Sequence, residues 1–315
     1  MTLIGSFDVN SKDIYNQIEK GISHGFSHFE ATYFKPKELI IDTNKNDLLK
    51  LYSFLKSKNV SIDVIKTGFY NYEMESPQFI ESMEKALVNI SCLKPRFMVI
   101  GLPNGLLLQG DMNLFDSEFI SSLEGLIKMS DKHGIKLLFE IKKEKVQIVS
   151  LLFSQSKKLS KEMMFVYDSV TLYKNGEALL LTYRHLRDNI VLVKTNNINK
   201  AGTPTLILDG EIDYKELIKR LIRDNYHEYI SIDTDFNYDY KNDEKTTDSV
   251  QKKSVFKNIC KSFTNTFSRK KQLQKKEQQR VSKNMEQKGQ ILNFDTVIDS
   301  QVHNITQLFK EQIEL

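Results

Sequence analysis

The sequence predicts an α/β protein folded as a closed (β/α)8 barrel, or TIM barrel, with parallel strands inside and helices outside. Short apolar segments rich in β-branched and aromatic residues alternate with segments of helical periodicity. Eight such units occupy about 236 residues, a typical size for this barrel. A doubly wound open sheet is the alternative, but its glycine fingerprint does not follow the first strand, where the sequence reads Asp8-Val-Asn.

Each predicted strand is short and dominated by strand-forming residues, as strands buried on both faces are. The last one, Tyr-Ile-Ser-Ile at 229–232, follows a helix directly and is followed by a carboxylate. The strands are expected at residues 3–7, 26–30, 60–65, 96–100, 135–139, 163–167, 190–193 and 229–232.

The helices between the strands are indicated by apolar residues at helical spacing and by end signals. Asp213, with Glu216 three residues later, is typical of a capping box. Ser76 and Pro77 open another helix with a cap and a first-turn proline, and Gly134 ends a third. Helices are expected at residues 11–20, 46–58, 77–90, 116–132, 146–153, 177–186 and 213–222.

The composition excludes several classes of protein. Cys92 and Cys260 are the only cysteines, so we expect neither a disulfide framework nor a cysteine-based metal site, and a reducing compartment. The N-terminus lacks a basic segment followed by an apolar run, and no run of about 18 apolar residues occurs. A phosphate-binding loop, zinc-ligand spacing and a nucleophile elbow are not found either. These features predict a cytoplasmic protein.

Charged side chains follow most of the predicted strands. In barrels of this kind the chemistry lies at the carboxyl ends of the strands. Carboxylates there can bind a divalent cation, which polarises a carbonyl while a neighbouring carboxylate moves a proton. Charges at exposed strand ends can equally be ordinary solvent-facing groups. The polar residues at the strand ends are Asp8, Glu30, Lys66, Asn104, Glu140, Asp168, Lys194 and Asp233.

The order and spacing of five segments resemble the xylose isomerase-like TIM barrels, the sugar phosphate isomerase/epimerase superfamily. The similarity covers roughly residues 1–236. The segments are Gly-Phe-Ser-His-Phe-Glu at 25–30, Lys-His-Gly-Ile-Lys-Leu-Leu-Phe-Glu at 132–140, Phe-Val-Tyr-Asp at 165–168, Asp-Gly-Glu-Ile-Asp-Tyr-Lys-Glu-Leu at 209–217 and Tyr-Ile-Ser-Ile-Asp at 229–233.

The resemblance implies a divalent metal held by two glutamates, an aspartate and a histidine, with the glutamates moving the substrate proton. By position, Glu140 is the first ligand and base, Asp168 the second ligand, and Asp233 stands in the place of the second glutamate. The family motif His-x-Lys-Asp reads Leu192-Val-Lys-Thr195 here, so the histidine ligand is replaced. The metal site is therefore degenerate, although Mn²⁺ or Mg²⁺ could still bind oxygen ligands.

Two classes of function follow, and the sequence leaves open whether the barrel is an enzyme. The first is a sugar or sugar-phosphate isomerase or epimerase acting by metal-assisted proton transfer, with Glu140 and Asp233 catalytic. Glu30, Lys66 and Lys194 would then bind the substrate. The second is a catalytically inactive barrel that serves as a binding or interaction module. A Schiff-base aldolase using Lys194 or Lys66 is a third interpretation.

The chain beyond the barrel changes in composition. Residues 237–251 are polar and resemble a linker. Residues 252–267 have one apolar face and are expected to be the eighth helix of the barrel, or else a basic amphipathic helix that meets a protein or an anionic membrane. Residues 268–315 form a basic tail, partly disordered and partly helical. Its closing apolar residues, which predict docking on the barrel or self-association, are Ile298, Val302, Ile305 and Phe309.

The positive charge is concentrated in this extension. Residues 251–288 hold twelve lysines and arginines against two glutamates, a balance of +10 in a chain of net charge +4. The remainder is therefore mildly acidic, at −6. Because aromatic residues are not interleaved with the basic ones in residues 268–288, we expect no sequence-specific binding of nucleic acid.

Overall fold

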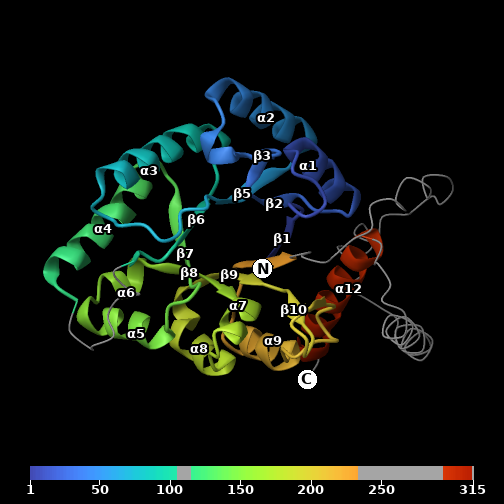
Figure 1. Cartoon of the computed structure of the whole chain (residues 1–315). Helices are drawn as coiled ribbons and strands as arrows, with labels where there is room; N and C mark the ends of the chain where they lie inside the picture. The colour runs from blue at the N-terminus through green and yellow to red at the C-terminus, as the bar shows by residue number, and fades with distance from the viewer. Residues whose placement is uncertain (105–114, 233–293, 314–315) are drawn as a thin grey trace, which may run out of the picture.

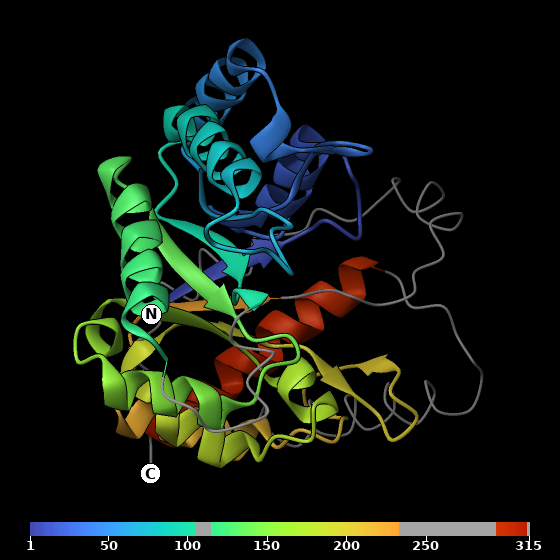
Figure 2. The same ribbon diagram turned by 60° about the vertical axis from the view of Figure 1, so that its left-hand side comes forward.

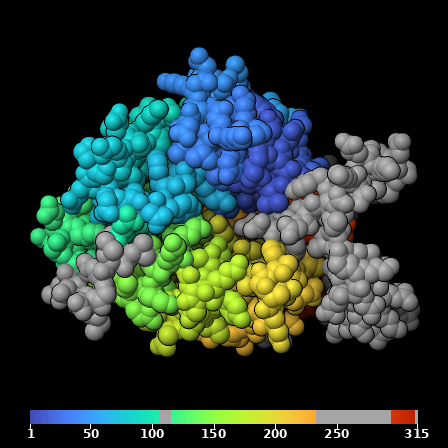
Figure 3. Space-filling view, viewed as in Figure 1, coloured from blue at the N-terminus to red at the C-terminus, as the bar shows by residue number. Residues whose placement is uncertain are grey.

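The computed structural model describes residues 1–104, 115–232 and 294–313. Eight parallel strands close a barrel in the order β1-β12-β9-β8-β7-β6-β5-β2, with helices outside it (Figure 1). Successive segments follow one another around the surface, from the blue N-terminal part to the yellow one (Figure 3). The predicted TIM barrel is confirmed.

The barrel strands begin within two residues of their predicted positions and end within one. They are β1 (Thr2–Ser6), β2 (His28–Ala31), β5 (Ser61–Lys66), β6 (Phe97–Gly101), β7 (Lys136–Glu140), β8 (Met164–Asp168), β9 (Ile190–Lys194) and β12 (Tyr229–Ile232). Two hairpins that the sequence did not suggest are inserted after strands: β3 (Tyr33–Lys35) with β4 (Glu38–Leu39), and β10 (Asn197–Ile198) with β11 (Pro204–Thr205).

The helices match the predicted periodic segments, with short additions. Asp213 caps its helix by accepting from the backbone N–H groups of Lys215 and Glu216, whereas the Ser76 hydroxyl donates to the side chain of Gln78. The α-helices are α1 (Ile14–Ser23), α2 (Lys45–Lys58), α3 (Pro77–Ile90), α4 (Ser117–Lys132), α5 (Val146–Gln155), α6 (Leu159–Glu162), α7 (Ser169–Lys174), α8 (Leu179–Leu186), α9 (Tyr214–Arg223) and α12 (Phe294–Ile313). The 3₁₀ turns are Ile40–Asp42, Ser91–Leu93 and Arg187–Asn189.

The barrel interior is filled by an apolar layer, defined here by eight side chains, and is therefore a packed core and not a pore. A larger cluster of buried apolar side chains lies between the strands and the helices. The interior layer consists of Ile4, Val64, Phe97, Val99, Leu138, Val166, Leu192 and Tyr229.

A hydrogen-bonded network closes the amino-terminal end of the barrel. A register shift between β2 and β5 accompanies Asp63, whose carboxylate accepts from Tyr229 Oη at 3.1 Å and faces His28 Nδ1 at 3.0 Å. The Arg96 guanidinium donates to Tyr229 Oη at 2.7 Å. Because catalysis in these barrels occurs at the other end, we assign His28 and this network to holding the strands together.

The C-terminal helix α12 packs on the barrel against α9 and β12 (Figures 1 and 2). Phe294, Ile298 and Ile305 are fully buried, and the ring centroid of Phe294 lies 5.8 Å from that of Phe7. Gln301 Oε1 accepts from the backbone N–H of Ile207 at 2.9 Å. The docking on the barrel that the sequence left open for this segment is therefore present in the structure, and its self-association stays a prediction.

The other predictions for the extension concern residues outside the described ranges. They are the linker at 237–251, the eighth helix at 252–267, the basic segment 268–288 and its protein or membrane partner, and they stay predictions. In the described ranges, none of the helices combines the length and the apolar character needed to span a membrane.

A histidine joins α12 to α1. His24, just after α1, points Nε2 at Asp295 Oδ1 (2.7 Å) and Nδ1 at Asp299 Oδ1 (3.0 Å). Both ring nitrogens donate only when the imidazole is protonated. Burial opposes protonation, but the hydrogen bonds with Asp295 and Asp299 outweigh it and raise the pKa of His24 above its ordinary value. Lys20, on α1, also contacts Asp295 at 2.6 Å.

We expect this contact to make the docking of α12 depend on pH. A raised histidine pKa stabilises the fold fully below about pH 6.5, and this contribution is lost as the pH rises through the folded pKa. The pKa of Asp295 is lowered by its hydrogen bond with His24, so the aspartate contribution is lost only in acid, below its ordinary range. The difference in melting temperature between the wild type and His24→Gln should be larger at about pH 5.5 than at about pH 8.5.

His133 offers the matched control because it follows α4 as His24 follows α1. His133→Gln should leave the docking of α12 unchanged at both pH values. An equal loss of stability in His24→Gln at both pH values would contradict a protonated contact.

Candidate functional site at the barrel mouth

The strands place polar side chains directly above the interior apolar layer. Because side chains alternate between the two faces of a strand, the residue two positions beyond a layer residue also points inward. That step leads from Leu138 to Glu140 on β7 and from Leu192 to Lys194 on β9. The same step from Val64, Val166 and Tyr229 leads to Lys66, Asp168 and Ser231.

At this mouth, acidic and basic side chains alternate in one continuous series, which we call the mouth charge chain. It contains three carboxylates and three ammonium groups, so its formal charges cancel. Its members, in spatial order, are Lys142, Glu140, Lys194, Glu30, Lys66 and Asp8.

Glu140 is the most heavily bonded member and is fully buried. Its Oε1 lies 2.9 Å from Lys142 Nζ and 3.0 Å from Lys194 Nζ, and its Oε2 accepts from Tyr70 Oη at 2.7 Å. Burial raises the pKa of this carboxyl, but the two ammonium groups and the Tyr70 hydroxyl outweigh burial and hold it well below its usual range. Burial and the neighbouring Glu140 raise the pKa of Tyr70 in turn.

Glu30 occupies the other half of the mouth and is also buried. Its Oε2 accepts from Ser231 Oγ at 2.6 Å. Its Oε1 lies 3.3 Å from Lys66 Nζ and 4.0 Å from Lys194 Nζ, distances of ion pairs without hydrogen-bond alignment. Burial raises the pKa of Glu30, but Lys66, Lys194 and Ser231 together lower it below its ordinary value. Asp8 ends the series, 4.0 Å from Lys66 Nζ.

Tyr70 covers Glu140 from the loop after β5, and Gly101 makes room for it. A Cβ atom at Gly101 would lie 2.6 Å from the Tyr70 ring, closer than real Cβ contacts allow, and 3.3 Å from the Phe69 carbonyl oxygen, which is a tight contact. Lys142 Nζ, which also contacts Glu140, lies over the Tyr70 ring, 5.2 Å from its centroid. Access to Glu140 therefore requires Tyr70 or Lys142 to move.

The structure brings together four of the predicted site residues: Glu30, Lys66, Glu140 and Lys194. Asp168 has a different role. Its Oδ1 accepts from the backbone N–H of Thr171 at 3.2 Å and its Oδ2 from Thr171 Oγ1 at 2.9 Å, so it caps α7. Asp233 follows Ile232 directly but lies outside the described residues, so its predicted catalytic and metal-binding roles stay predictions.

The described residues do not fit a divalent cation at this mouth. Both oxygens of Glu140 already accept from lysine or tyrosine donors, and both oxygens of Asp168 accept from Thr171. Leu192, in the place of the histidine that the resemblance implies, is fully buried in the apolar layer and has no atom that could bind a metal. Across the described ranges, no three histidine, cysteine, aspartate or glutamate side chains are grouped to hold a metal ion.

Sequence reasoning missed three members of the site. Lys142 and Tyr70 lie in loops, two and four residues beyond the ends of β7 and β5, so a search limited to strand ends passes over them. Ser231 was hidden inside an apolar strand, where a small hydroxyl gives little signal. Counting from the apolar layer towards the carboxyl end of each strand in steps of two would have found Ser231. Including the four residues after each strand would have found Tyr70 and Lys142.

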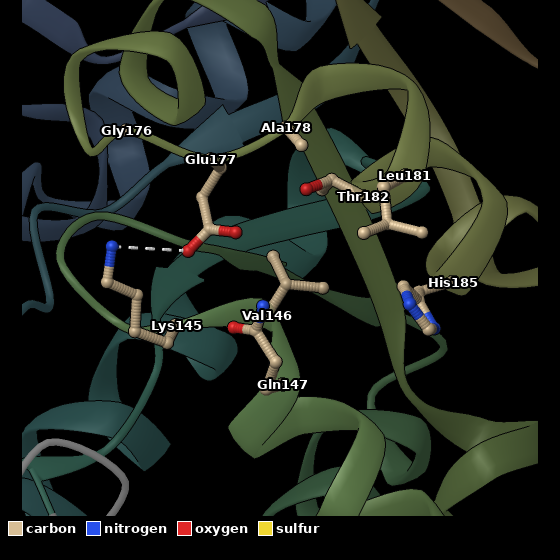
Figure 4. A pocket seen from close by; sticks show the side chains of 9 residues that line it. All are labelled: Lys145, Val146, Gln147, Gly176, Glu177, Ala178, Leu181, Thr182 and His185. Carbon is tan, nitrogen blue, oxygen red and sulfur yellow. Dashed lines mark ion pairs between the residues drawn. The ribbon is translucent and has the colours of Figure 1, made fainter.

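A separate pocket of about 420 Å³ lies at the side of the barrel, between α5 and α8 (Figure 4). Lys145 and Glu177 form an ion pair of 3.5 Å across it. None of the mouth residues lines this pocket. We therefore place the candidate chemistry at the mouth, where buried charges converge.

Comparisons with known proteins identify the fold. No protein-family model matches the sequence, and no curated protein matches it. Among solved structures, an L-ribulose 3-epimerase matches with a TM-score of 0.61 and 13% identity, over 100% of this chain and 96% of the other. A xylose isomerase domain protein from Planctomyces limnophilus matches with a TM-score of 0.54 and 10% identity, over 74% and 89%. An IolI protein with a bound zinc atom matches at 0.55 and 14%, over 73% and 88%. The chain thus has the fold of the xylose isomerase-like sugar phosphate isomerases and epimerases, as the sequence predicted.

Proposed function

We propose that the barrel binds a small sugar or sugar phosphate at its mouth and interconverts isomers or epimers of it by moving a proton. The observation that carries the proposal is Glu140, a buried carboxylate at the end of β7 that is surrounded by hydrogen-bond donors. Structures of an L-ribulose 3-epimerase and of a D-psicose 3-epimerase with D-fructose, both of this fold, support the choice of substrate class.

In this proposal Glu140 is the base that removes a proton from the carbon beside the substrate carbonyl. In the closed mouth its lowered pKa makes it a weak base. A substrate oxygen that takes over the donors of Lys142 and Tyr70 leaves Glu140 with fewer partners, and its pKa then rises towards the range that suits proton transfer. Substrate binding and activation of the base are therefore one event.

The remaining charged residues bind and orient the substrate. Lys66 and Lys194 donate to its hydroxyl or phosphate oxygens, and Glu30 accepts from its hydroxyl groups. Asp233, the residue after β12, is proposed as the second proton carrier, which returns the proton on the opposite face or at the neighbouring carbon.

An inactive binding module is the second candidate, and one observation favours it. Every oxygen of Glu140 is bonded within the protein, so the mouth is stable without a substrate. Such a barrel would bind the same class of ligand and leave it unchanged.

Exchange of carbon-bound hydrogen separates the two candidates. We expect the wild type to exchange the hydrogen beside the carbonyl of a ketopentose, a ketohexose or one of their phosphates in D₂O, measured by NMR. Glu140→Gln should slow that exchange by about 10²–10⁴-fold, because it removes the base and keeps its shape. Glu118→Gln, on the exposed side of α4, is the control and should leave the rate unchanged.

A ligand from the panel that binds to the wild type, binds more weakly to Glu140→Gln and shows no exchange would support the binding module. Failure of the whole panel both to bind and to exchange would contradict a sugar ligand at this mouth.

A further inference from the structure

We infer that Lys194 holds the position that a divalent cation would need at this mouth, so that the site works without a bound metal ion. The inference rests on the proposed function only for the chemistry that Lys194 serves. The statement about metal binding rests on the geometry of the mouth alone.

Lys194 is the central member of the mouth charge chain. Its Nζ lies 3.0 Å from Glu140 Oε1 and 4.0 Å from Glu30 Oε1, between the two buried carboxylates that could otherwise share an ion. Its side chain is 5% exposed. In the sheet register Lys194 lies between Asp168 of β8 and Ser231 of β12, so the barrel fixes the backbone position from which its side chain extends.

The charge of the mouth leads to the same conclusion. A divalent ion beside Glu140 would approach the ammonium groups of Lys194 and Lys142, both within 3.0 Å of the oxygen that it needs as a ligand. Repulsion between buried like charges at such distances is strong, because little water screens it. Leu192 lies two residues before Lys194 on the same inward face of β9, and its apolar side chain contributes no metal ligand. The site therefore already has the positive charge that its carboxylates require.

The chemistry that a cation would supply can come from the ammonium group. As the proton passes from the substrate carbon to the Glu140 carboxylate, the C–H electron pair moves into the adjacent bond and the carbonyl oxygen becomes negative. Lys194 Nζ donates a hydrogen bond to that oxygen and stabilises the enediolate. Return of the proton to the other face of the same carbon restores the original carbonyl. Return to the neighbouring carbon also requires the hydroxyl proton of the enediolate to pass to the former carbonyl oxygen, and the carbonyl then forms at the oxygen that gave it up. The electrons balance within the substrate, so no oxidant or reductant is required.

Titration of the full chain with Mn²⁺ tests the inference without any substrate. Calorimetry should show no stoichiometric binding of Mn²⁺ to the wild type, and neither EDTA nor millimolar Mn²⁺ should shift its melting temperature. In Lys194→Met, Glu140 and Glu30 face a position that has lost its positive charge. We expect this variant to melt at a lower temperature than the wild type and Mn²⁺ to raise that temperature.

Lys136→Met is the matched control, since Lys136 lies on β7 at the opposite end and pairs with the exposed Asp131. It should gain no response to Mn²⁺. Stoichiometric binding of Mn²⁺ to the wild type that is lost in Glu140→Gln would overturn the inference. So would a folded Lys194→Met protein whose melting temperature ignores Mn²⁺. If Lys194→Met does not fold, the same melting measurement with and without Mn²⁺ on Lys194→Gln, together with the titration of the wild type, tests the inference in its place.

The outcome is separable from that of the proposed function. If the wild type does not bind Mn²⁺ and does not convert the sugars, the proposed enzymatic activity is contradicted and the inference about metal binding is not. A wild type that exchanges the substrate hydrogen and stops in EDTA supports the enzyme and overturns the inference.

Discussion

Replacing Lys194 by methionine, or Glu140 by leucine, should lower the free energy of unfolding by about 3–5 kcal/mol, because each change removes one partner of a buried ion pair and leaves the other charge in place. Replacing both should cost much less than the sum of the two. In the double variant the central ion pair becomes two apolar side chains of similar size, Lys142 is 38% exposed and can turn to water, and Glu30 keeps Lys66 and Ser231.

Urea denaturation of the wild type, the two single variants and the double variant forms a double-mutant cycle. It should be run near neutral pH. The pKa values of Glu30 and Glu140 are lowered in the fold, so the stabilisation they provide is complete above the ordinary glutamate range and is lost as the pH falls through the folded values.

The exposed pair Lys136 and Asp131, 2.9 Å apart, is the control for the cycle. Its coupling energy should be about 0–1 kcal/mol, as for other solvent-exposed pairs. Additive effects of the two mouth substitutions would show that Glu140 and Lys194 do not stabilise each other, and would remove the physical basis of the mouth charge chain.

The mouth was predictable from the sequence where strand periodicity decides the direction of a side chain. Glu140 and Lys194 each lie two residues beyond a buried leucine, and a strand permits only one orientation at that step. The sequence therefore places both in the barrel interior. Asp168 obeys the same rule, yet its carboxylate turns to cap α7, because a free helix end competes for it. The alternation of side chains along a strand predicts which way Asp168 points, but not that its carboxylate bonds to the free end of α7.

The loop residues could not be placed in the same way. Tyr70 reaches Glu140 because Gly101, on the neighbouring strand, leaves space for its ring, a contact between segments 31 residues apart. Lys142 follows β7 by two residues, where the chain has already left the sheet. Both contacts depend on how loops fold over the barrel, and loop conformations follow no repeating pattern.

The extension shows a second limit of local reasoning. The sequence contains two amphipathic segments, 252–267 and the one around 298–313, and both have an apolar face suited to docking. Which segment occupies the surface between α1 and α9 depends on the shape of that surface. His24, just after α1, and the backbone N–H of Ile207 provide partners for Asp295 and Gln301, and these pairings span more than 90 residues.

Replacing Ile305 by alanine should therefore destabilise the whole barrel by about 2–5 kcal/mol, the usual cost of truncating a buried isoleucine. Ile305 is fully buried in α12, which packs on α9 and β12. If α12 were a detachable appendage, a substitution in it would loosen only the helix and leave the unfolding of the barrel unchanged. If α12 completes the core, thermal and urea unfolding should both shift as single transitions.

His303, two residues earlier on the exposed side of α12, distinguishes loss of packing from loss of helix. His303→Ala keeps or raises helix propensity and removes no buried contact, so its stability should stay within about 0.5 kcal/mol of the wild type. A large effect of Ile305→Ala beside a small effect of His303→Ala would establish that residues 294–313 belong to the folding unit of the barrel. Equal and small effects would mean that the barrel folds without its last helix, and that the contact through His24 is peripheral to its stability.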